Sequence, residues 1–432
     1  MNGNRPPEMI HLLIALEVVV LSAFLVLLSP LGKGIADSVP ASGVIGERTE
    51  QEEKEESEEK RDYIKWVDFQ VTKEAMEKAF RYDVDTCQSE LHLNWIELLA
   101  YLGARYGGDF SRYKAADMEK IVQRLLDGEK MEDITADMKY YSYYLEAYGA
   151  VLGGMVGEFQ VQIPEEQAPA FALRGKEETG EPQTHGEESG PAGGEETSAE
   201  AADESRAGGR GTDESRADES ETDDGLVWVT KYGLKAFSPI AKNYPYQDYD
   251  DFGAARSYGF KRQHLGHDMM GQVGTPVICV ESGYVEAIGW NQYGGWRLGI
   301  RSFDGRRYYY YAHLRKNYPY HKSLTEGSIV QAGDVIGYLG RTGYSRTENT
   351  NNIDEPHLHF GIQLIFDESQ KEGNNEIWIN CYEIVKFLAM NRSETVKNQE
   401  TKEYYRVYQM KDPVIPGGGT EQRIEKQAVD GA

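Results

Sequence analysis

The chain has 432 residues, a net charge of -26 at pH 7 and three cysteines. This length is enough for two ordinary domains. Proteins that recognise phosphate backbones need clustered Lys and Arg, so the acidic balance argues against a nucleic-acid-binding protein. The cysteines, Cys87, Cys279 and Cys381, are scattered and form no C-x-x-C pair, which excludes a disulfide framework and a cysteine-based metal site.

The first predicted element is the apolar run MIHLLIALEVVVLSAFLVLLS at Met9–Ser29. About 20 helical residues span a hydrocarbon core of ~30 Å, so this run predicts a membrane-spanning helix in spite of Glu17. A cleaved signal peptide is the alternative, but the run is longer than a usual signal-peptide core and no clear A-x-A site follows. We therefore expect a single-pass membrane anchor at residues 1–30, with the bulk of the chain outside the cytoplasm.

Residues 31–61 are predicted to form a charged stalk, because Glu47–Arg61 mixes acidic and basic side chains without an apolar stripe. In residues 62–163, apolar side chains recur at spacings of three and four, and Gly or Asp ends the periodic runs. The pattern continues to Glu158 and predicts a small all-α domain. Glu97 invites comparison with glycosidases, but no second carboxylate accompanies it. Binding of a protein partner or a positioning role is therefore the preferred interpretation of this domain.

Residues 164–225 are rich in Glu, Asp, Ser, Gly and Ala and contain DESRA twice, which predicts a disordered acidic linker. Residues 226–391 then consist of short β-prone runs separated by glycines. Their close spacing leaves no room for crossover helices, so we expect a mainly antiparallel β-domain. An amphipathic helix at Tyr382–Met390 should close this domain, and residues 392–432 should form a polar tail. The predicted fold is thus multidomain.

Six of the nine histidines fall in the stretch from His264 to His359. His264 and Asp268 form an H-x-x-x-D motif, His313 ends the strand-like run RYYYYAHL, and His357 and His359 form H-x-H in another predicted strand. Side chains two apart in a strand project from the same side. Neutral imidazole and carboxylate suit Zn²⁺, and a catalytic zinc site has three protein ligands and an open position for water. Each motif alone is weak, but their combination is much stronger.

These motifs, HLGHD, YYAHL, GSIVQAGDVIGYLGRTGYS and PHLHFGI, resemble the lysostaphin or LytM-type peptidases of family M23 in order and spacing. The resemblance covers Lys231–Phe366, about a third of the chain. It implies a LytM/lysostaphin-like β-domain with one Zn²⁺ per chain. It further implies that His264, Asp268 and His359 bind the metal and that His313 and His357 are the catalytic pair.

By this resemblance the protein is expected to be a zinc-dependent endopeptidase that hydrolyses peptide bonds in bacterial peptidoglycan during cell-wall remodelling. It would be held at the cell membrane and face the cell wall, so the positioning role of residues 62–163 would be at the wall. The alternative is a non-catalytic scaffold or activator that binds peptidoglycan or a partner protein, as degenerate members of the family do. A zinc peptidase that acts on glycine-rich or other proteins is a further alternative.

Two positions depart from the family pattern. The segment Arg346–Glu355 is several residues longer than usual and is expected to border the substrate groove, and Gly361 stands where an acidic residue is common. His267 and His321 are competing candidates for ligands. The register of the H-x-x-x-D motif predicts that His267 points outward, away from the metal.

Overall fold

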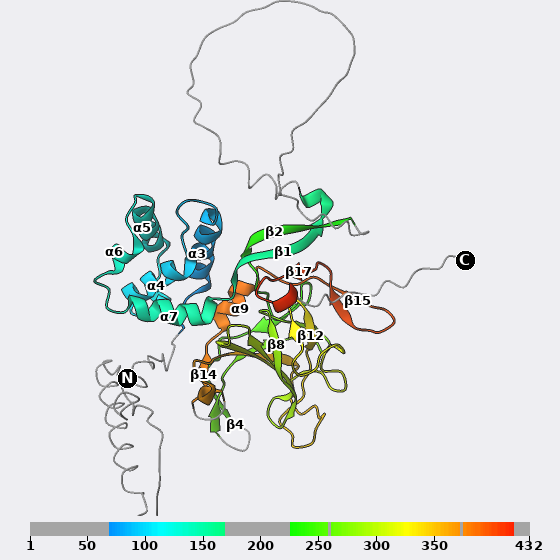
Figure 1. Ribbon diagram of the computed structural model, residues 1–432. Helices are drawn as coiled ribbons and strands as arrows, with labels where there is room; N and C mark the ends of the chain where they lie inside the picture. The colour runs from blue at the N-terminus through cyan, green and yellow to red at the C-terminus, as the bar shows by residue number, and fades with distance from the viewer. Residues whose placement is uncertain (1–68, 169–224, 258–260, 372–374, 419–432) are drawn as a thin grey trace, which may run out of the picture. The chain divides into compact units, whose positions relative to one another are not determined.

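The computed structural model describes four stretches of the chain (Figure 1), which are residues 69–168, 225–257, 261–371 and 375–418. The expected membrane anchor at residues 1–30, the charged stalk at 31–61 and most of the acidic linker lie outside the described residues. Among the described helices, none is both long and apolar enough to cross a bilayer.

The first described stretch is helical up to Leu152, as the apolar spacing predicts. Its α-helices are α3 (Lys73–Thr86), α4 (Trp95–Tyr106), α5 (Ala115–Leu126), α6 (Met131–Thr135) and α7 (Tyr141–Leu152). Asn94 caps α4, because its side-chain oxygen accepts hydrogen bonds from the first free backbone N–H groups, and Gly107 ends the helix in a left-handed conformation. Helices α4 and α7 pack closely because Gly103 has no side chain: a Cβ there would lie 2.8 Å from the hydroxyl oxygen of Tyr148.

The second half of the described chain is built on an antiparallel sheet. Its strands are β3 (Gln247–Asp248), β6 (His267–Met270), β8 (Gly283–Asn291), β9 (Gly295–Ser302), β10 (Arg307–Ala312), β11 (Ile329–Val330), β13 (His357–Leu364) and β14 (Ile377–Ile379). They follow the order β11-β8-β9-β10-β13-β6-β3, and β14 also pairs with β13. All of these pairings are antiparallel, which confirms the predicted fold class of this domain.

Two short strand pairs accompany this sheet. One joins β7 (Pro276–Ile278) to β12 (Val335–Tyr338), and the other is a hairpin of β4 (Ala255–Ser257) and β5 (Lys261–Gln263). The hairpin lies directly before His264 in the chain.

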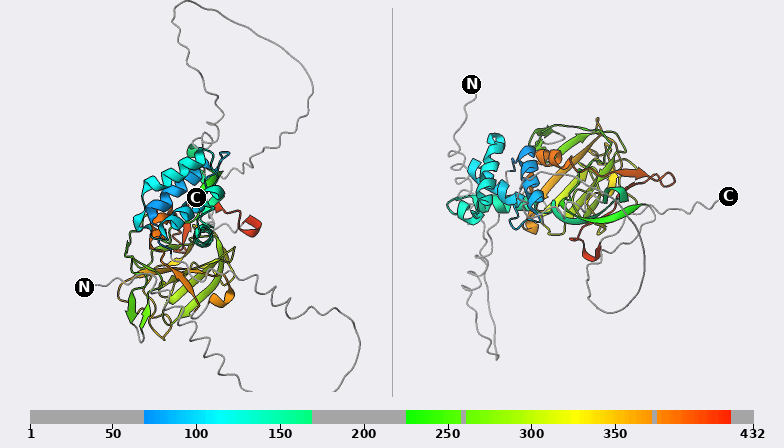
Figure 2. Two further views of the ribbon diagram at one scale, coloured as in Figure 1. Left: turned by 90° about the vertical axis from the view of Figure 1, so that its left-hand side faces the viewer. Right: turned by 90° about the horizontal axis from the view of Figure 1, so that it is seen from above.

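A long hairpin corrects the predicted boundary between the helical domain and the linker. Strand β1 (Val156–Pro164) pairs with β2 (Leu226–Leu234) along its whole length, from Val156 opposite Leu234 to Pro164 opposite Leu226 (Figures 1 and 2). The prediction of helix up to Glu158 is therefore wrong at its end. The chain leaves α7 at Gly153 and Gly154 and continues as strand β1, in which Phe159 is buried between the exposed Glu158 and Gln160.

This hairpin also changes the meaning of the acidic segment. Residues 169–224 connect the two strands of one hairpin. The strand ends on either side of this segment, Pro164 and Leu226, lie opposite each other although they are far apart in the sequence. Residues 169–224 do not separate a helical domain from a β-domain, because the chain has already passed from helices to strands before they begin. The predicted linker therefore connects two paired strands instead of two domains.

The helical segment and the sheet share one hydrophobic core. Phe387 of α9 (Tyr382–Leu388) stacks on Trp95 with ring centroids 5.7 Å apart, and it meets Phe80 edge-on at 5.8 Å. The backbone N–H of Lys73 donates to the Glu383 carboxylate across 2.7 Å. The predicted closing helix is thus present, ending at Leu388 instead of Met390, and it packs against the helical segment.

A buried ion pair makes a second link between the two parts. Arg307, at the start of β10, donates two hydrogen bonds to Glu281 and a third to the backbone oxygen of Ala150 in α7. A Cβ on Gly154 would collide with the Glu281 carboxylate. The end of the helical segment is therefore fitted closely around this pair.

The prediction of a polar tail after residue 391 is wrong for the part that the structure describes. This part forms β15 (Thr395–Lys397), β16 (Tyr404–Arg406) and β17 (Met410–Lys411). β17 pairs with β1, and the side chains of Arg406 and Asp334 form an ion pair in the interior. The polar composition did not indicate these strands, because charged side chains such as Arg406 are paired inside the protein.

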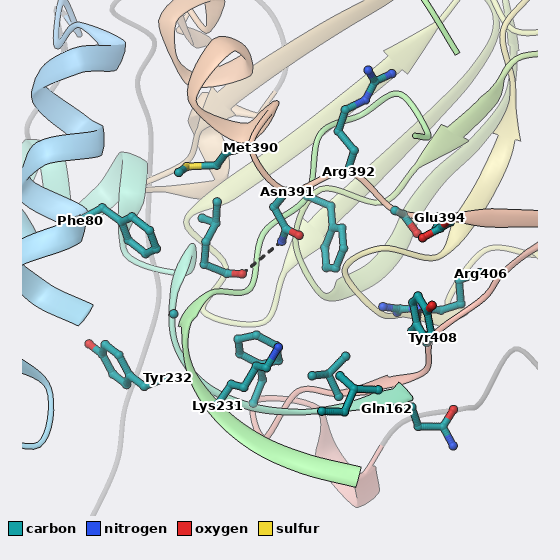
Figure 3. A pocket seen from close by; sticks show the side chains of 17 residues that line it. Phe80, Gln162, Lys231, Tyr232, Met390, Asn391, Arg392, Glu394, Arg406 and Tyr408 are labelled. Atoms are coloured by element: carbon teal, nitrogen blue, oxygen red, sulfur yellow. Dashed lines mark hydrogen bonds between the residues drawn. The ribbon is translucent and has the colours of Figure 1, made fainter. Parts of the chain in front are cut away.

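A pocket of about 420 Å³ lies where helix α3, the β1–β2 hairpin and the chain after α9 meet (Figure 3). The side-chain amide of Asn391 donates to the backbone oxygens of Leu234 and Ala236 at this place, which ties the chain after α9 to the end of β2. The pocket contains none of the predicted site residues.

Candidate metal centre and active site

Three neighbouring strands bring the predicted site residues together. β10, β13 and β6 are adjacent in the sheet, and their register places His359 opposite both Ala312 and Asp268. His313 directly follows β10, and His264 lies between β5 and β6. Motifs that are far apart in the sequence therefore meet at one place on the sheet.

His264, Asp268 and His359 form a tight triangle. The Nε2 atom of His264 lies 3.0 Å from Asp268 Oδ1 and 3.0 Å from His359 Nδ1, and His359 Nδ1 lies 2.9 Å from Asp268 Oδ1. His264 and Asp268 are buried, and His359 is largely so. Two imidazole nitrogens and a carboxylate oxygen converge here. A single proton can join only two of these three atoms in a hydrogen bond, so the third is left without a donor.

This arrangement fits a metal ion. For a tetrahedral Zn²⁺ with bonds of about 2.0–2.1 Å, neighbouring ligand atoms lie roughly 3.3 Å apart, close to the separations in the triangle. Among the described residues, these three form the group of histidine, cysteine and carboxylate side chains arranged to hold a metal. Gly266 makes room for the site, because a Cβ there would collide with the imidazole of His359.

The other two histidines of the predicted site lie beside this triangle. Nδ1 of His313 lies 2.9 Å from the backbone oxygen of Thr342, and Nδ1 of His357 lies 2.8 Å from that of Glu355. A carbonyl oxygen only accepts hydrogen bonds, so Nδ1 carries the proton in both rings and each Nε2 is left as an acceptor. The two ring centroids are 4.8 Å apart, and His357 Nε2 is 3.8 Å from Asp268 Oδ1.

The surroundings shift the protonation of these groups. Burial alone would raise the pKa of Asp268, but hydrogen bonds from His264 and His359 hold it well below its usual range. Burial, reinforced by His357 and His359, lowers the pKa of His313 well below its ordinary value. At neutral pH the site therefore contains an ionised Asp268 and a neutral His313.

The backbone at His313 is unusual. Its φ of 60° lies in the left-handed region, which costs a non-glycine residue of order 1–3 kcal/mol and is concentrated at functional sites. Its N–H donates to Gly294 O across 2.7 Å, and Gly343 passes so closely that a Cβ there would lie 3.0 Å from His313 Nδ1. The surrounding loops thus hold His313 in a conformation that it would not adopt by itself.

His267 and His321 lie outside the cluster. His267 Nε2 is 3.2 Å from Asp248 Oδ2, and the ring meets Tyr382 of α9 edge-on. The prediction that His267 points outward is wrong in one respect: its side chain does face away from Asp268, but both faces of β6 are covered, so His267 is buried. His321 Nδ1 lies 2.7 Å from Ser323 Oγ, remote from the triangle.

The two departures from the family pattern have structural explanations. In the segment Arg346–Glu355, Asn349 accepts hydrogen bonds from the indole of Trp296 and from the backbone of Asn317. Asn352 of the same segment donates to the backbone oxygen of Tyr344, whose ring centroid is 5.7 Å from that of His313. Gly361 leaves no room for an acidic side chain, because a Cβ there would lie 2.7 Å from the ring of Trp378.

Two further residues contact the triangle and were not found from the sequence. Asp251 Oδ1 lies 3.0 Å from His264 Nδ1, and the guanidinium of Arg256 lies 3.3 Å from Asp268 Oδ2. Asp251 stands in the acidic stretch QDYDD and precedes His264 by 13 residues. No motif spacing distinguishes it there from its exposed neighbours.

The part of the chain that contains the candidate site is similar to known proteins. Residues 262–373 match the model of peptidase family M23, and all five predicted site residues lie in this range. The L-Ala–D-Glu endopeptidase of Bacillus subtilis (strain 168) is 40% identical over 124 residues, which are 29% of this chain and 36% of that protein. Lysostaphin of Staphylococcus staphylolyticus is 38% identical over 98 residues, which are 22% of this chain and 18% of that protein.

Among solved structures, the catalytic domain of the antimicrobial peptidase lysostaphin from Staphylococcus simulans is 30% identical. The superposition covers 33% of this chain and 92% of that domain, with a TM-score of 0.26. The chain spans about a third or less of the length of the two curated relatives.

Proposed function

Residues 262–373 form a domain of peptidase family M23, and from this premise we propose that the protein is a zinc-dependent endopeptidase that cleaves peptide bonds of bacterial peptidoglycan. The observation that carries the proposal is the convergence of His264, Asp268 and His359 beside two further histidines. The relatives named above are an L-Ala–D-Glu endopeptidase and lysostaphin. A stem or cross-link peptide of the cell wall is therefore the proposed substrate.

His264, Asp268 and His359 would hold one Zn²⁺ per chain. When bound, the ion supplies Lewis acidity and lowers the pKa of a bound water toward ~7. The protein's own contribution starts with Asp268, whose ionised carboxylate needs no deprotonation before it acts as a ligand.

His357 and His313 would accept a proton from the attacking water and pass it on. Each ring presents an unprotonated Nε2, because Nδ1 is committed to Glu355 O or Thr342 O. Neither ring can donate from Nε2 before it has accepted a proton, so the pair first takes the proton of the attacking water, with His357 as the base. The proton taken from the water would then pass to the leaving amine as the C–N bond breaks, a role that typically contributes about 10²–10⁴ to the rate.

The site argues for a working enzyme and against the non-catalytic alternative, because neither a ligand nor a catalytic histidine is missing. The test is digestion of purified peptidoglycan by the zinc-loaded full chain, with and without a chelator, and mass spectrometry of the fragments. We expect new peptide termini that disappear with chelator and return with added zinc. Peptidoglycan that is bound but left intact by the zinc-loaded protein would favour a scaffold.

We further propose that residues 1–30 anchor the protein in the cell membrane, with the rest facing the cell wall. The support is the apolar run Met9–Ser29 in the sequence. Cell fractionation should recover the protein with membranes, and a protease added outside the membrane should remove a C-terminal epitope. Release into the medium would instead indicate a cleaved signal. A protein partner for the helical segment stays a prediction.

A further inference from the structure

A short turn before His264 is built into the metal site. The backbone N–H of Gly253 donates to His264 O across 2.7 Å, and that of His264 donates to Ala254 O across 2.9 Å. Gly253 has a φ of 77°, which favours glycine, and this lets the chain fold back on itself. The turn therefore fixes Asp251 and His264 relative to each other through main-chain bonds, before any side chain contributes.

Asp251 faces the side of His264 that points away from the triangle. His264 turns Nε2 toward Asp268 and His359, so its other nitrogen, Nδ1, must find a different partner. Two oxygens of Asp251 face Nδ1: the buried carboxylate oxygen Oδ1 lies 3.0 Å from Nδ1, and the backbone oxygen lies 3.4 Å from it. A carboxylate there favours the tautomer with a proton on Nδ1, which leaves the Nε2 lone pair for the metal.

Arg256 connects this carboxylate to a second ligand. Its guanidinium contacts Oδ2 of Asp251 and also lies 3.3 Å from Oδ2 of Asp268. Asp268 thus offers Oδ1 to the triangle while Oδ2 is engaged by Arg256. Arg256 on the β4–β5 hairpin contacts Asp268, and Asp251 beside the turn at Gly253 contacts His264. Residues outside the triangle therefore contact two of its three members.

We propose that Asp251 and Arg256 are positioning residues of the metal site, with Asp251 orienting the His264 imidazole and Arg256 joining Asp251 to the outer oxygen of Asp268. Both lie outside residues 262–373, so the segment before the family domain would complete its site. The proposal rests on the proposed zinc-dependent function. Loss of such an outer partner typically weakens metal affinity about 10–100-fold.

The test is zinc affinity, measured by competition with a chromophoric chelator on the full chain, together with the visible absorption of the Co²⁺-substituted protein. Asp251→Ala should weaken zinc binding about 10–100-fold and change the Co²⁺ spectrum, and Asp251→Asn should recover part of the loss because it retains an acceptor. Arg256→Gln should weaken binding less. If Asp251→Ala does not fold, Asp251→Asn and Arg256→Gln carry the test.

Asp248 supplies a matched control. It pairs with His267 at 3.2 Å, in a histidine–carboxylate contact on the other face of β6, away from the triangle. Asp248→Ala should leave zinc affinity and the Co²⁺ spectrum unchanged. Wild-type protein that binds zinc no more tightly than the folded Asp251→Ala and Arg256→Gln variants would overturn the positioning role. A wild-type protein that binds no zinc would instead overturn the proposed function.

Discussion

The Nδ1–H of His313 donates to the backbone oxygen of Thr342 across 2.9 Å, and the Thr342 side chain is itself fixed by two further bonds. The Thr342 hydroxyl donates to Leu314 O across 2.6 Å and accepts from the backbone N–H of Trp296 across 3.1 Å. The orientation of the His313 ring therefore depends on a buried threonine that is not part of the His264–Asp268–His359 triangle.

Thr342→Val should lower kcat roughly 10–100-fold, since small misplacements of a catalytic group have effects of this size. Valine has nearly the shape of threonine but removes both hydroxyl bonds, which leaves Leu314 O and the Trp296 N–H without their partner. Steady-state kinetics should show the change in kcat with zinc content unaltered. Thr342→Ser retains the hydroxyl and is the control. An unchanged kcat in Thr342→Val would mean that His313 is oriented without this residue.

His313→Ala and His359→Ala should separate catalysis from metal binding. His313 lies beside the triangle and His359 is one of its corners. We therefore expect His313→Ala to keep one zinc per chain and to lose about 10²–10⁴ of the rate. His359→Ala should lose both zinc and activity. Metal analysis of the purified variants alongside a peptidoglycan digestion assay checks this. Zinc loss in His313→Ala would place that residue among the ligands.

The candidate site residues could be selected from the sequence because they lie in short histidine and aspartate motifs. Strand alternation predicts that His357 and His359 share a side, but the register that sets His359 opposite Asp268 and Ala312 is a property of the folded sheet. Asp251 carries no such signal, since it is one of several acidic residues in a loop and acquires its role through the turn at Gly253.

The errors in the predicted fold have a common physical origin. β1 and β2 are separated by residues 169–224 in sequence, so no local pattern indicates that they pair. The segment after residue 391 is polar, yet Arg406 and Asp334 satisfy each other inside the protein. Long-range pairing and buried charge are properties of the folded chain that residue composition does not reveal.

Acid should destabilise the metal-free protein partly through His313. Its pKa is lowered by burial, so below about 6.5, the ordinary pKa of histidine, the unfolded chain takes up a proton that the folded chain does not. The free energy of unfolding should therefore fall as the pH drops below that value. His264, whose pKa is raised, has the opposite sign, since burial opposes its charge but Asp268 and Asp251 outweigh it.

His313→Gln isolates this contribution, because glutamine does not titrate and can still donate to Thr342 O. Urea unfolding of metal-free protein at pH 7.5 and 5.5 should show a smaller loss of stability in the variant than in the wild type. Equal losses in the two proteins would mean that other groups carry the acid sensitivity.

The Arg307–Glu281 pair should be important for stability. Arg307→Met leaves the Glu281 carboxylate buried without its cation and frees the oxygen of Ala150, and removing one partner of a buried pair costs about 3–5 kcal/mol. Chemical denaturation measures the change. The double variant Arg307→Met, Glu281→Met should lose less than the single one, because no buried charge is left unpaired; Asp304, which also pairs with Arg307, is exposed. Lys242→Ala, which removes an exposed partner of Glu394, should change stability little.

Two glycines near the end of the helical segment should respond to alanine with opposite signs. Gly149 lies inside α7 with no atom within 4 Å of the position of a Cβ, so Gly149→Ala should stabilise the protein by about 0.5–1 kcal/mol through helix propensity. Gly154 lies against Glu281, and a Cβ there would collide with the carboxylate that Arg307 holds. Because that carboxylate is fixed on both oxygens, Gly154→Ala should be destabilising by about 1–3 kcal/mol. Thermal unfolding of the two variants side by side checks the prediction, and a Gly154→Ala protein as stable as Gly149→Ala would show that the helical segment is not fitted to the sheet through this ion pair.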